Sequence, residues 1–418
     1  MLSPANFLRR KFRSIFLTDV SPSSTLARLE TSWDINKTIS RVQAHRFVIT
    51  DLQYLLDFAI IFFVLCIVTE PGPILRILIA IGFSLLLLIP ITSQFFFPFL
   101  PIGTWLFLFY SCRFVPASWR PPIWVRVLPS LETIFYGGNL SNVLAAQKSP
   151  VLDILAWIPY GLIHFGGPFV CSAVIFLFAA PGTLPVFAHA FGYMNLIGVS
   201  IQLMFPNSPP WYENMYGLVP ATYDVKGSPG GLARVDQIIG LDLYTSSFTA
   251  SPMVFGAFPS LHSGCAVIEV LFMSYLFPRL TPYLMGYVLW IWWSTMYLTH
   301  HYFVDLIGGA ILSLSVFVLV ARSYLPKVQP DKPSRWAYDY VELGILPAPK
   351  ARLTKEYTPG DWTLYNSSDS SDAYTLTPTS EWEIETLADN EDEFNRPLVN
   401  ANNAKPSRAL NEKAVYEG

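Results

Sequence analysis

Three side chains in two short segments of this sequence could carry out acid–base or nucleophilic chemistry. His301 and Asp305, in "THHYFVDLIGG", are four residues apart, so on a helix they share one face and can form a hydrogen bond. A carboxylate in that position fixes the tautomer of the imidazole and raises its basicity, as a histidine nucleophile or base requires. His262, in "FPSLHSG", begins another apolar run. We therefore expect two histidines and one carboxylate to meet at one end of a helical bundle.

The residues before His262 are typical of a helix N-terminus. Pro259 is followed by Ser260, whose hydroxyl can accept hydrogen bonds from the free amides of a first turn. Such a terminus favours anions, and phosphate is the obvious candidate. Taken alone, His262 fits an ordinary interfacial histidine better, but the second segment favours a catalytic role. The rival interpretation is a metal site, and two histidines with one aspartate form a sparse ligand set, so we expect no metal and no other cofactor.

A reacting phosphate also needs positive charge near its oxygens. The segment "DVKGSPGGLARVD" supplies Lys226 and Arg234, which we take, with Ser260, as candidates to bind substrate phosphate. Either cation could instead be a solvated loop charge.

The composition indicates that membrane helices position these residues. Of 418 residues, 52% are hydrophobic and 14% are charged, which is typical of a membrane protein. Apolar stretches near the roughly 20 residues of a membrane span occupy about 52–69, 73–91, 93–112, 154–180, 184–205, 262–278, 283–300 and 302–323. Prolines interrupt 93–112 and 154–180. The expected fold is therefore an all-α polytopic membrane protein with six to eight transmembrane helices.

Charge and composition divide the chain into three parts. Residues 1–50 are basic and are expected to be cytosolic. Residues 51–324 form the predicted transmembrane catalytic domain, with 206–261 as a lumenal loop. Residues 325–418 are predicted to be a cytosolic, largely disordered tail, because 366–395 is rich in Ser, Thr, Asp and Glu. Both termini would then be cytosolic and the spans even in number, although the basic stretch 113–130 favours six spans over eight.

The motif pair resembles a known superfamily. Pro259-Ser260-Leu261-His262, followed by His301-x-x-x-Asp305, is similar to the second and third motifs of the type 2 phosphatidic acid phosphatase superfamily. Residues 206–310 look like the catalytic subunits of the fungal inositol phosphorylceramide synthases. Two features depart from the superfamily pattern. Lys226 and Arg234 are eight positions apart instead of seven, and Ser294-Thr295 stands where a Ser-Arg pair is expected.

The resemblance implies a helical bundle of that superfamily and a metal-free, two-step transfer. His301 would attack the phosphorus of phosphatidylinositol while Asp305 orients the imidazole. His262 would protonate the departing diacylglycerol and then deprotonate the primary hydroxyl of ceramide. The resemblance also implies a Golgi membrane and a small membrane-embedded regulatory subunit; no nucleic-acid partner is expected. The alternatives are a lipid phosphate phosphatase, with water in place of ceramide, and a non-enzymatic membrane scaffold.

Overall fold

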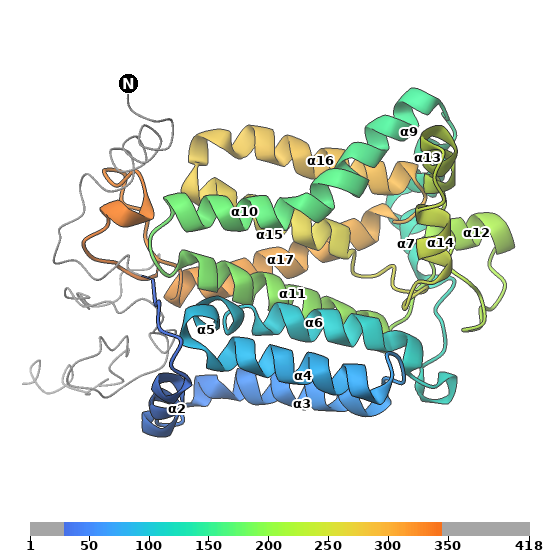
Figure 1. The fold of residues 1–418 in the computed structure, drawn as a ribbon. Coiled ribbons are helices and arrows are strands. Elements are labelled where there is room, and N and C mark those ends of the chain that lie inside the picture. Colours follow the sequence, from blue (N-terminus) through green and yellow to red (C-terminus); the bar gives the residue numbers. More distant parts are fainter. Residues whose placement is uncertain (1–28, 345–418) are drawn as a thin grey trace, which may run out of the picture. The chain divides into compact units, whose positions relative to one another are not determined.

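The computed structural model describes residues 29–344, and the regular elements in this range are helices. Most of the basic N-terminal cluster and the tail from residue 345 lie outside the described residues. Each predicted apolar stretch contains a helix: α3 (Leu52–Ile67), α4 (Pro73–Leu88), α6 (Leu100–Ser111), α10 (His164–Phe178), α11 (Thr183–Met204), α15 (Leu261–Leu276), α16 (Thr281–Tyr297) and α17 (Phe303–Ser323). These helices run side by side in Figure 1. The expected all-α membrane fold is confirmed.

Length and hydropathy identify fewer spans than the six to eight expected. Within residues 29–344, four runs are long and apolar enough, namely Ile49–Ile67, Pro150–Phe178, Thr183–Met204 and Phe303–Ser323. A fifth is added if α4 and α5 (Pro90–Phe96), bent by 101°, count as one. The difference comes from helix length, since α6, α15 and α16 have 12, 16 and 17 residues.

The two ends of the bundle carry different segments. At one end lie α2 (Ile35–Ala44) and residues 325–344, as Figure 1 shows. At the other end lie the short helices α7 (Val127–Tyr136), α8 (Leu140–Ala145), α9 (Pro150–Trp157), α12 (Pro210–Tyr216), α13 (Leu232–Ile239) and α14 (Tyr244–Thr249). The described chain therefore begins and ends at the same end of the bundle.

The basic stretch 113–130 lies beside the loop 206–261. The Trp124 amide donates a hydrogen bond to the Pro206 carbonyl (2.8 Å), and the Arg120 guanidinium lies 4.8 Å from the ring centroid of Tyr223. Arg120 also donates to the carbonyl of Cys112 (2.6 Å), at the end of α6. Arg120, one of the basic residues that favoured six spans, thus has local partners at the chain turn.

Small residues bring α15 and α17 into close contact. A Cβ at Gly309 would lie 2.1 Å from the carbonyl oxygen of Ser260, so the two backbones touch where glycine is present. The Ser263 hydroxyl donates to the Leu306 carbonyl (2.7 Å), and the Ser313 hydroxyl donates to the Gly264 carbonyl (2.6 Å). Close backbone approach through small residues is a common packing mode between membrane helices. The contact holds the N-terminal ends of α15 and α17 together.

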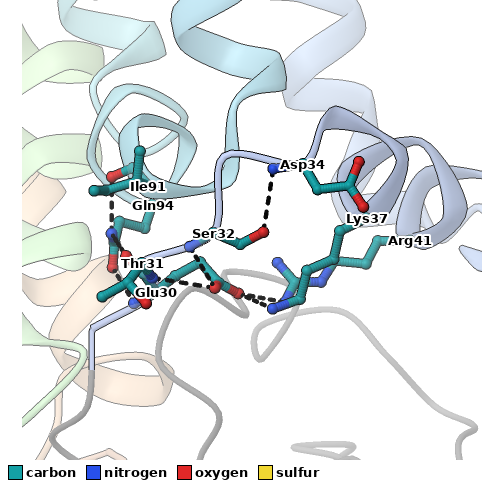
Figure 2. A network of polar contacts seen from close by, with 8 residues as sticks. All are labelled: Glu30, Thr31, Ser32, Asp34, Lys37, Arg41, Ile91 and Gln94. Carbon is teal, nitrogen blue, oxygen red and sulfur yellow. Dashed lines mark hydrogen bonds and ion pairs between the residues drawn. The ribbon is translucent and has the colours of Figure 1, made fainter.

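A polar network at the opposite end ties α2 to α5 (Figure 2). Glu30 accepts hydrogen bonds from Lys37 and from Arg41 (3.0 Å), and both donors belong to α2. The amide of Gln94, in α5, donates to the Glu30 carbonyl (2.8 Å), and the Glu30 backbone N–H donates to the Gln94 side chain (3.0 Å). One residue therefore joins the amphipathic helix, through its carboxylate, to the membrane bundle, through its backbone.

Candidate active site

The structure brings His262, His301 and Asp305 into one chain of contacts. Nδ1 of His262 lies 3.0 Å from Nε2 of His301, and Nδ1 of His301 lies 3.2 Å from Oδ2 of Asp305. His262 is in the first turn of α15, and Asp305 is in the first turn of α17. Asp305 is fully buried and His301 is 6% exposed. If His301 carries its proton on Nδ1, facing the carboxylate, Nε2 keeps a free lone pair.

Ser260 acts here as a helix cap. Its hydroxyl accepts a hydrogen bond from the Ser263 amide (3.3 Å), as the sequence pattern predicts. Its own amide donates to the Asp305 carbonyl (2.9 Å), which joins the starts of α15 and α17. Ser260 is fully buried. The serine therefore fixes the distance between the two histidine-bearing segments, and its role toward phosphate stays a prediction.

Backbone contacts shape the turn that presents His301. The carbonyl of Thr295 accepts from the amides of His300 (2.9 Å) and His301 (3.4 Å), and Thr299 has a positive φ of 64°. Glu132 of α7 accepts from the Val304 amide (2.8 Å), which places a carboxylate at the N-terminus of α17. The turn is thus fixed from both sides.

Ser294 and Thr295, which stand where a Ser-Arg pair is expected, lie in the interface between packed helices. Both side chains are fully buried. The Ser294 hydroxyl donates to the carbonyl of Ala156 in α9, and the Thr295 hydroxyl donates to the Trp292 carbonyl (2.9 Å). This position therefore joins α16 to α9, and positive charge for a phosphate must come from elsewhere.

Tyr160 and His164 surround His262, and the sequence analysis did not select them. The Tyr160 ring stacks on the His262 ring (centroids 4.5 Å apart, 26° between planes), and the His164 ring is 4.6 Å away. Tyr160 lies in a π-helical segment, Ile158–Ile163, between α9 and α10. Such segments are frequent at functional sites. The signal in the sequence is Pro159, which interrupts an apolar stretch. That interruption alone does not predict that Tyr160 contacts His262.

His300 anchors the loop that precedes α13. Its Nε2 lies 3.0 Å from the Pro229 carbonyl, and its ring packs 4.7 Å from that of Phe248. Burial, together with the nearby His301, lowers the pKa of His300 to about 3. His300 connects the turn before α17 to the loop before α13. Gly231 donates to the Leu298 carbonyl (2.9 Å) at the same contact.

The two predicted phosphate-binding cations lie in this docked loop, in different surroundings. Arg234, in α13, is paired with Asp153 of α9, and the Tyr297 hydroxyl also donates to that carboxylate (2.9 Å). Lys226 is exposed and immediately precedes Gly227 and Ser228, which line the cavity described next. Whether either cation binds phosphate stays a prediction.

A cavity of about 1060 Å³ extends from the histidines into the bundle. One end is lined by His262, His301, His300 and Tyr160, and the walls come from α6, α10 and α11. Aromatic side chains make up much of these walls, among them Phe99, Trp105, Phe109, Phe169, Phe187 and Phe191. A largely apolar cavity of this size, with the histidines in its lining, suits a lipid whose headgroup reacts at the histidines.

The part of the chain from residue 29 to residue 344 contains no group of three or more His, Cys, Asp or Glu side chains arranged to hold a metal ion.

Comparisons with known proteins identify the family. Residues 123–319, which include both histidines and Asp305, match the PAP2 superfamily. The inositol phosphorylceramide synthase catalytic subunit of Schizosaccharomyces pombe is 53% identical over 317 residues, covering 76% of this chain and 75% of that protein. The inositol phosphorylceramide synthase of Candida albicans is 50% identical over 332 residues (79% and 70%), and the catalytic subunit of Saccharomyces cerevisiae is 50% identical over 333 residues (79% and 82%). This chain belongs to the inositol phosphorylceramide synthase family, within the PAP2 superfamily.

Proposed function

We propose that this protein transfers phosphoinositol from phosphatidylinositol to the primary hydroxyl of ceramide, giving inositol phosphorylceramide and diacylglycerol. The observation that carries the proposal is the contact chain from Asp305 through His301 to His262 at the polar end of an apolar cavity. The names of the relatives support the choice of reaction, because they are synthases and half of the aligned positions are identical.

In the first step, Nε2 of His301 attacks the phosphorus, and the bond from phosphorus to the diacylglycerol oxygen breaks. The Asp305 carboxylate accepts a hydrogen bond from the Nδ1–H group of His301. The attacking nitrogen is therefore Nε2, the one that faces His262. A protonated His262 donates its proton to the departing oxygen. The anionic phosphate favours that protonated form, because an opposite charge nearby stabilises the imidazolium. Diacylglycerol leaves, and phosphoinositol stays on His301.

In the second step, the roles reverse. Neutral His262 takes the proton from the ceramide hydroxyl, and the hydroxyl oxygen attacks the phosphorus. The bond from phosphorus to Nε2 breaks, and both histidines return to their starting states. The hydrogen bond between the two rings must open for each phosphate to enter. Its 3.0 Å length places both nitrogens within reach of one phosphorus.

The proposal places the reaction at the lumenal face of the Golgi membrane. Residues 1–50 and 325–418 are then cytosolic, 51–324 form the transmembrane catalytic domain, and 206–261 is lumenal. The placement of residues 325–344 and α2 at the end opposite α12–α14 supports this arrangement. Lys226, Arg234 and Ser260 are proposed to stabilise the phosphate. A small membrane-embedded regulatory subunit is proposed as a partner.

The deciding experiment uses the purified protein in detergent–lipid micelles with headgroup-labelled phosphatidylinositol, with and without ceramide. We expect labelled inositol phosphorylceramide and an equal amount of diacylglycerol when ceramide is present. Release of soluble inositol phosphate at the same rate with and without ceramide would show a hydrolase of the phosphatase type, with water as the acceptor. No turnover with an intact fold would contradict the proposed transfer.

A further inference from the structure

A second set of buried polar atoms lies deeper in the bundle, between α10, α15 and α16. Glu269, on α15, is 3% exposed, and its Oε1 has no hydrogen-bond partner within residues 29–344. The hydroxyl of Tyr287, on α16, is also buried without a partner in that range, and it lies within electrostatic range of the Glu269 carboxyl. The mechanism above uses neither group.

The position of Glu269 relates it to the active site. It follows His262 by seven residues on α15, which is about two helical turns, or roughly 10 Å along the same face. A Cβ at residue 167 would lie 2.7 Å from Oε2 of Glu269, so Gly167 on α10 makes room for the carboxyl group. Glu269 and Tyr287 are not among the residues that line the cavity leading to the histidines. Pro168, next to Gly167, and Cys265, one helical turn before Glu269, do line it.

The chemistry of the two groups defines what they can bind. A carboxylate in an apolar interior is costly without a counter-charge, so the uncharged acid is the form that fits. A carboxylic acid and a phenol each carry one O–H donor. Two donors just behind the lining of an apolar cavity complement an oxygen acceptor on a lipid that reaches them. Ionisable side chains inside a membrane bundle generally mark such functional positions.

We propose that Glu269 and Tyr287 form a subsite that binds an oxygen atom in the body of a lipid substrate, below the reacting phosphate. This inference rests on the proposed function. The shared chemistry is a hydrogen-bond acceptor within an otherwise apolar lipid. It is either an ester carbonyl of phosphatidylinositol or a hydroxyl on a ceramide chain.

Paired substrates separate the two sources. One pair is diacyl phosphatidylinositol and its dialkyl ether analogue, and the other is ceramide with and without an additional chain hydroxyl. For one pair, we expect the wild-type enzyme to show a KM lower by on the order of 10-fold for the member that carries the oxygen, the usual effect of one hydrogen bond. Glu269→Leu and Tyr287→Phe should remove that preference without changing kcat for the member that lacks the oxygen. Glu269→Gln, which keeps a donor, should retain part of it.

Tyr283→Phe is the matched control, because Tyr283 lies one turn earlier on α16 and is 79% exposed; its preferences should equal those of wild type. The inference is overturned if wild type discriminates within neither pair, or if both variants keep the preference. A uniform fall in kcat for all substrates with a lower melting temperature would show a structural role and also overturn it. If the Glu269→Leu variant does not accumulate as folded protein, the Tyr287→Phe variant alone tests the inference. A wild-type enzyme that makes no inositol phosphorylceramide would instead refute the proposed function.

Discussion

Arg234 and Asp153 are 81 positions apart and form a multi-point ion pair, with Nε 2.9 Å and Nη2 2.6 Å from Oδ1 and Nε 3.0 Å from Oδ2. The pair joins α13, in the loop beside the active site, to α9, which leads into the π-helical segment with Tyr160. Asp153 is almost fully buried, whereas the Arg234 side chain is 29% exposed. The arginine therefore has a structural partner and an accessible side.

The variants Arg234→Lys and Asp153→Asn distinguish the structural ion pair of Arg234 from its proposed role in binding phosphate. Lysine keeps the charge and loses the planar fork. If Arg234 also binds phosphate, Arg234→Lys should raise KM for phosphatidylinositol by roughly 10-fold, the effect of about one charge-assisted hydrogen bond. Asp153→Asn should lower the melting temperature and change that KM much less. Equal changes in KM and stability for the two variants would limit Arg234 to holding the loop.

The sequence predicted the parts of this site that depend on local spacing. The contact between His301 and Asp305 is local in sequence, although His301 lies in the turn before α17 and only Asp305 lies in the helix. Ser260 caps α15 for the same local reason. Arg234 and Tyr160 depend on contacts between distant segments, with Asp153 and His262 respectively. Spacing within a segment carries no information about such partners.

In the fold, too, local features could be predicted from the sequence and contacts between distant segments could not. The apolar stretches predicted the helices, because hydrophobic length is a property of each segment. Charge alone left the path of 113–130 open between six and eight spans, and Arg120 of that stretch bonds to the carbonyl at Cys112 and packs on Tyr223. An arginine with such partners is a weak guide to the side of the membrane.

The orientation of the chain can be tested with single cysteines in a Cys66→Ala background, because Cys66 is the exposed native cysteine within residues 29–344. Thr222, in the loop, and Asn36, in α2, are both exposed. We expect Thr222→Cys in sealed Golgi vesicles to react with an impermeant maleimide only after permeabilisation. Asn36→Cys should react without it. Labelling of Thr222→Cys in sealed vesicles would reverse the proposed topology.

Acid should detach α2 from α5 through Glu30. Burial acts to raise the pKa of Glu30, but hydrogen bonds from Lys37, the Ser32 amide and Arg41 outweigh it and lower the pKa from 4.5 to about 2. A lowered carboxyl pKa stabilises the folded state above pH 4.5, and that stabilisation is lost as the pH falls toward 2. Hydrogen exchange of the α2 amides, corrected for intrinsic rates, should show protection falling in this window. Glu30→Gln should show weaker protection at pH 7 and little change in the window; unchanged protection in wild type down to pH 2 would contradict the assignment.

Asp305→Asn should keep the fold and slow the first step. The asparagine amide can donate to Nδ1 of His301, which moves the ring proton to Nε2 and removes the attacking lone pair. Loss of correctly oriented acid–base chemistry is worth roughly 10²–10⁴-fold in rate. The measurement is the initial rate of diacylglycerol release, with the melting temperature as the control for folding. A variant with the wild-type rate would show that the carboxylate does not set the tautomer.

The roles of the two histidines are separable by trapping the intermediate. His301→Ala removes the attacking nitrogen, so no labelled phosphoryl-enzyme should form from any donor. His262→Ala removes the acid of the first step and the base of the second. A donor that needs no protonation, an activated aryl phosphodiester of inositol, should then still label His301, and the label should persist when ceramide is added.

The persistence of that label is the discriminating result. Ceramide needs a base to lose its proton, and without His262 the second step should slow by roughly 10²–10⁴-fold. Wild type treated in parallel should lose its label within one turnover. Because Nδ1 of His262 lies 3.0 Å from Nε2 of His301, either ring can reach the phosphorus. The labelled residue must therefore be located by peptide mapping under alkaline conditions that preserve phosphohistidine. Label on His262 in the His301→Ala variant would exchange the two roles. Label on His301 that ceramide removes at the wild-type rate would show that another group is the base.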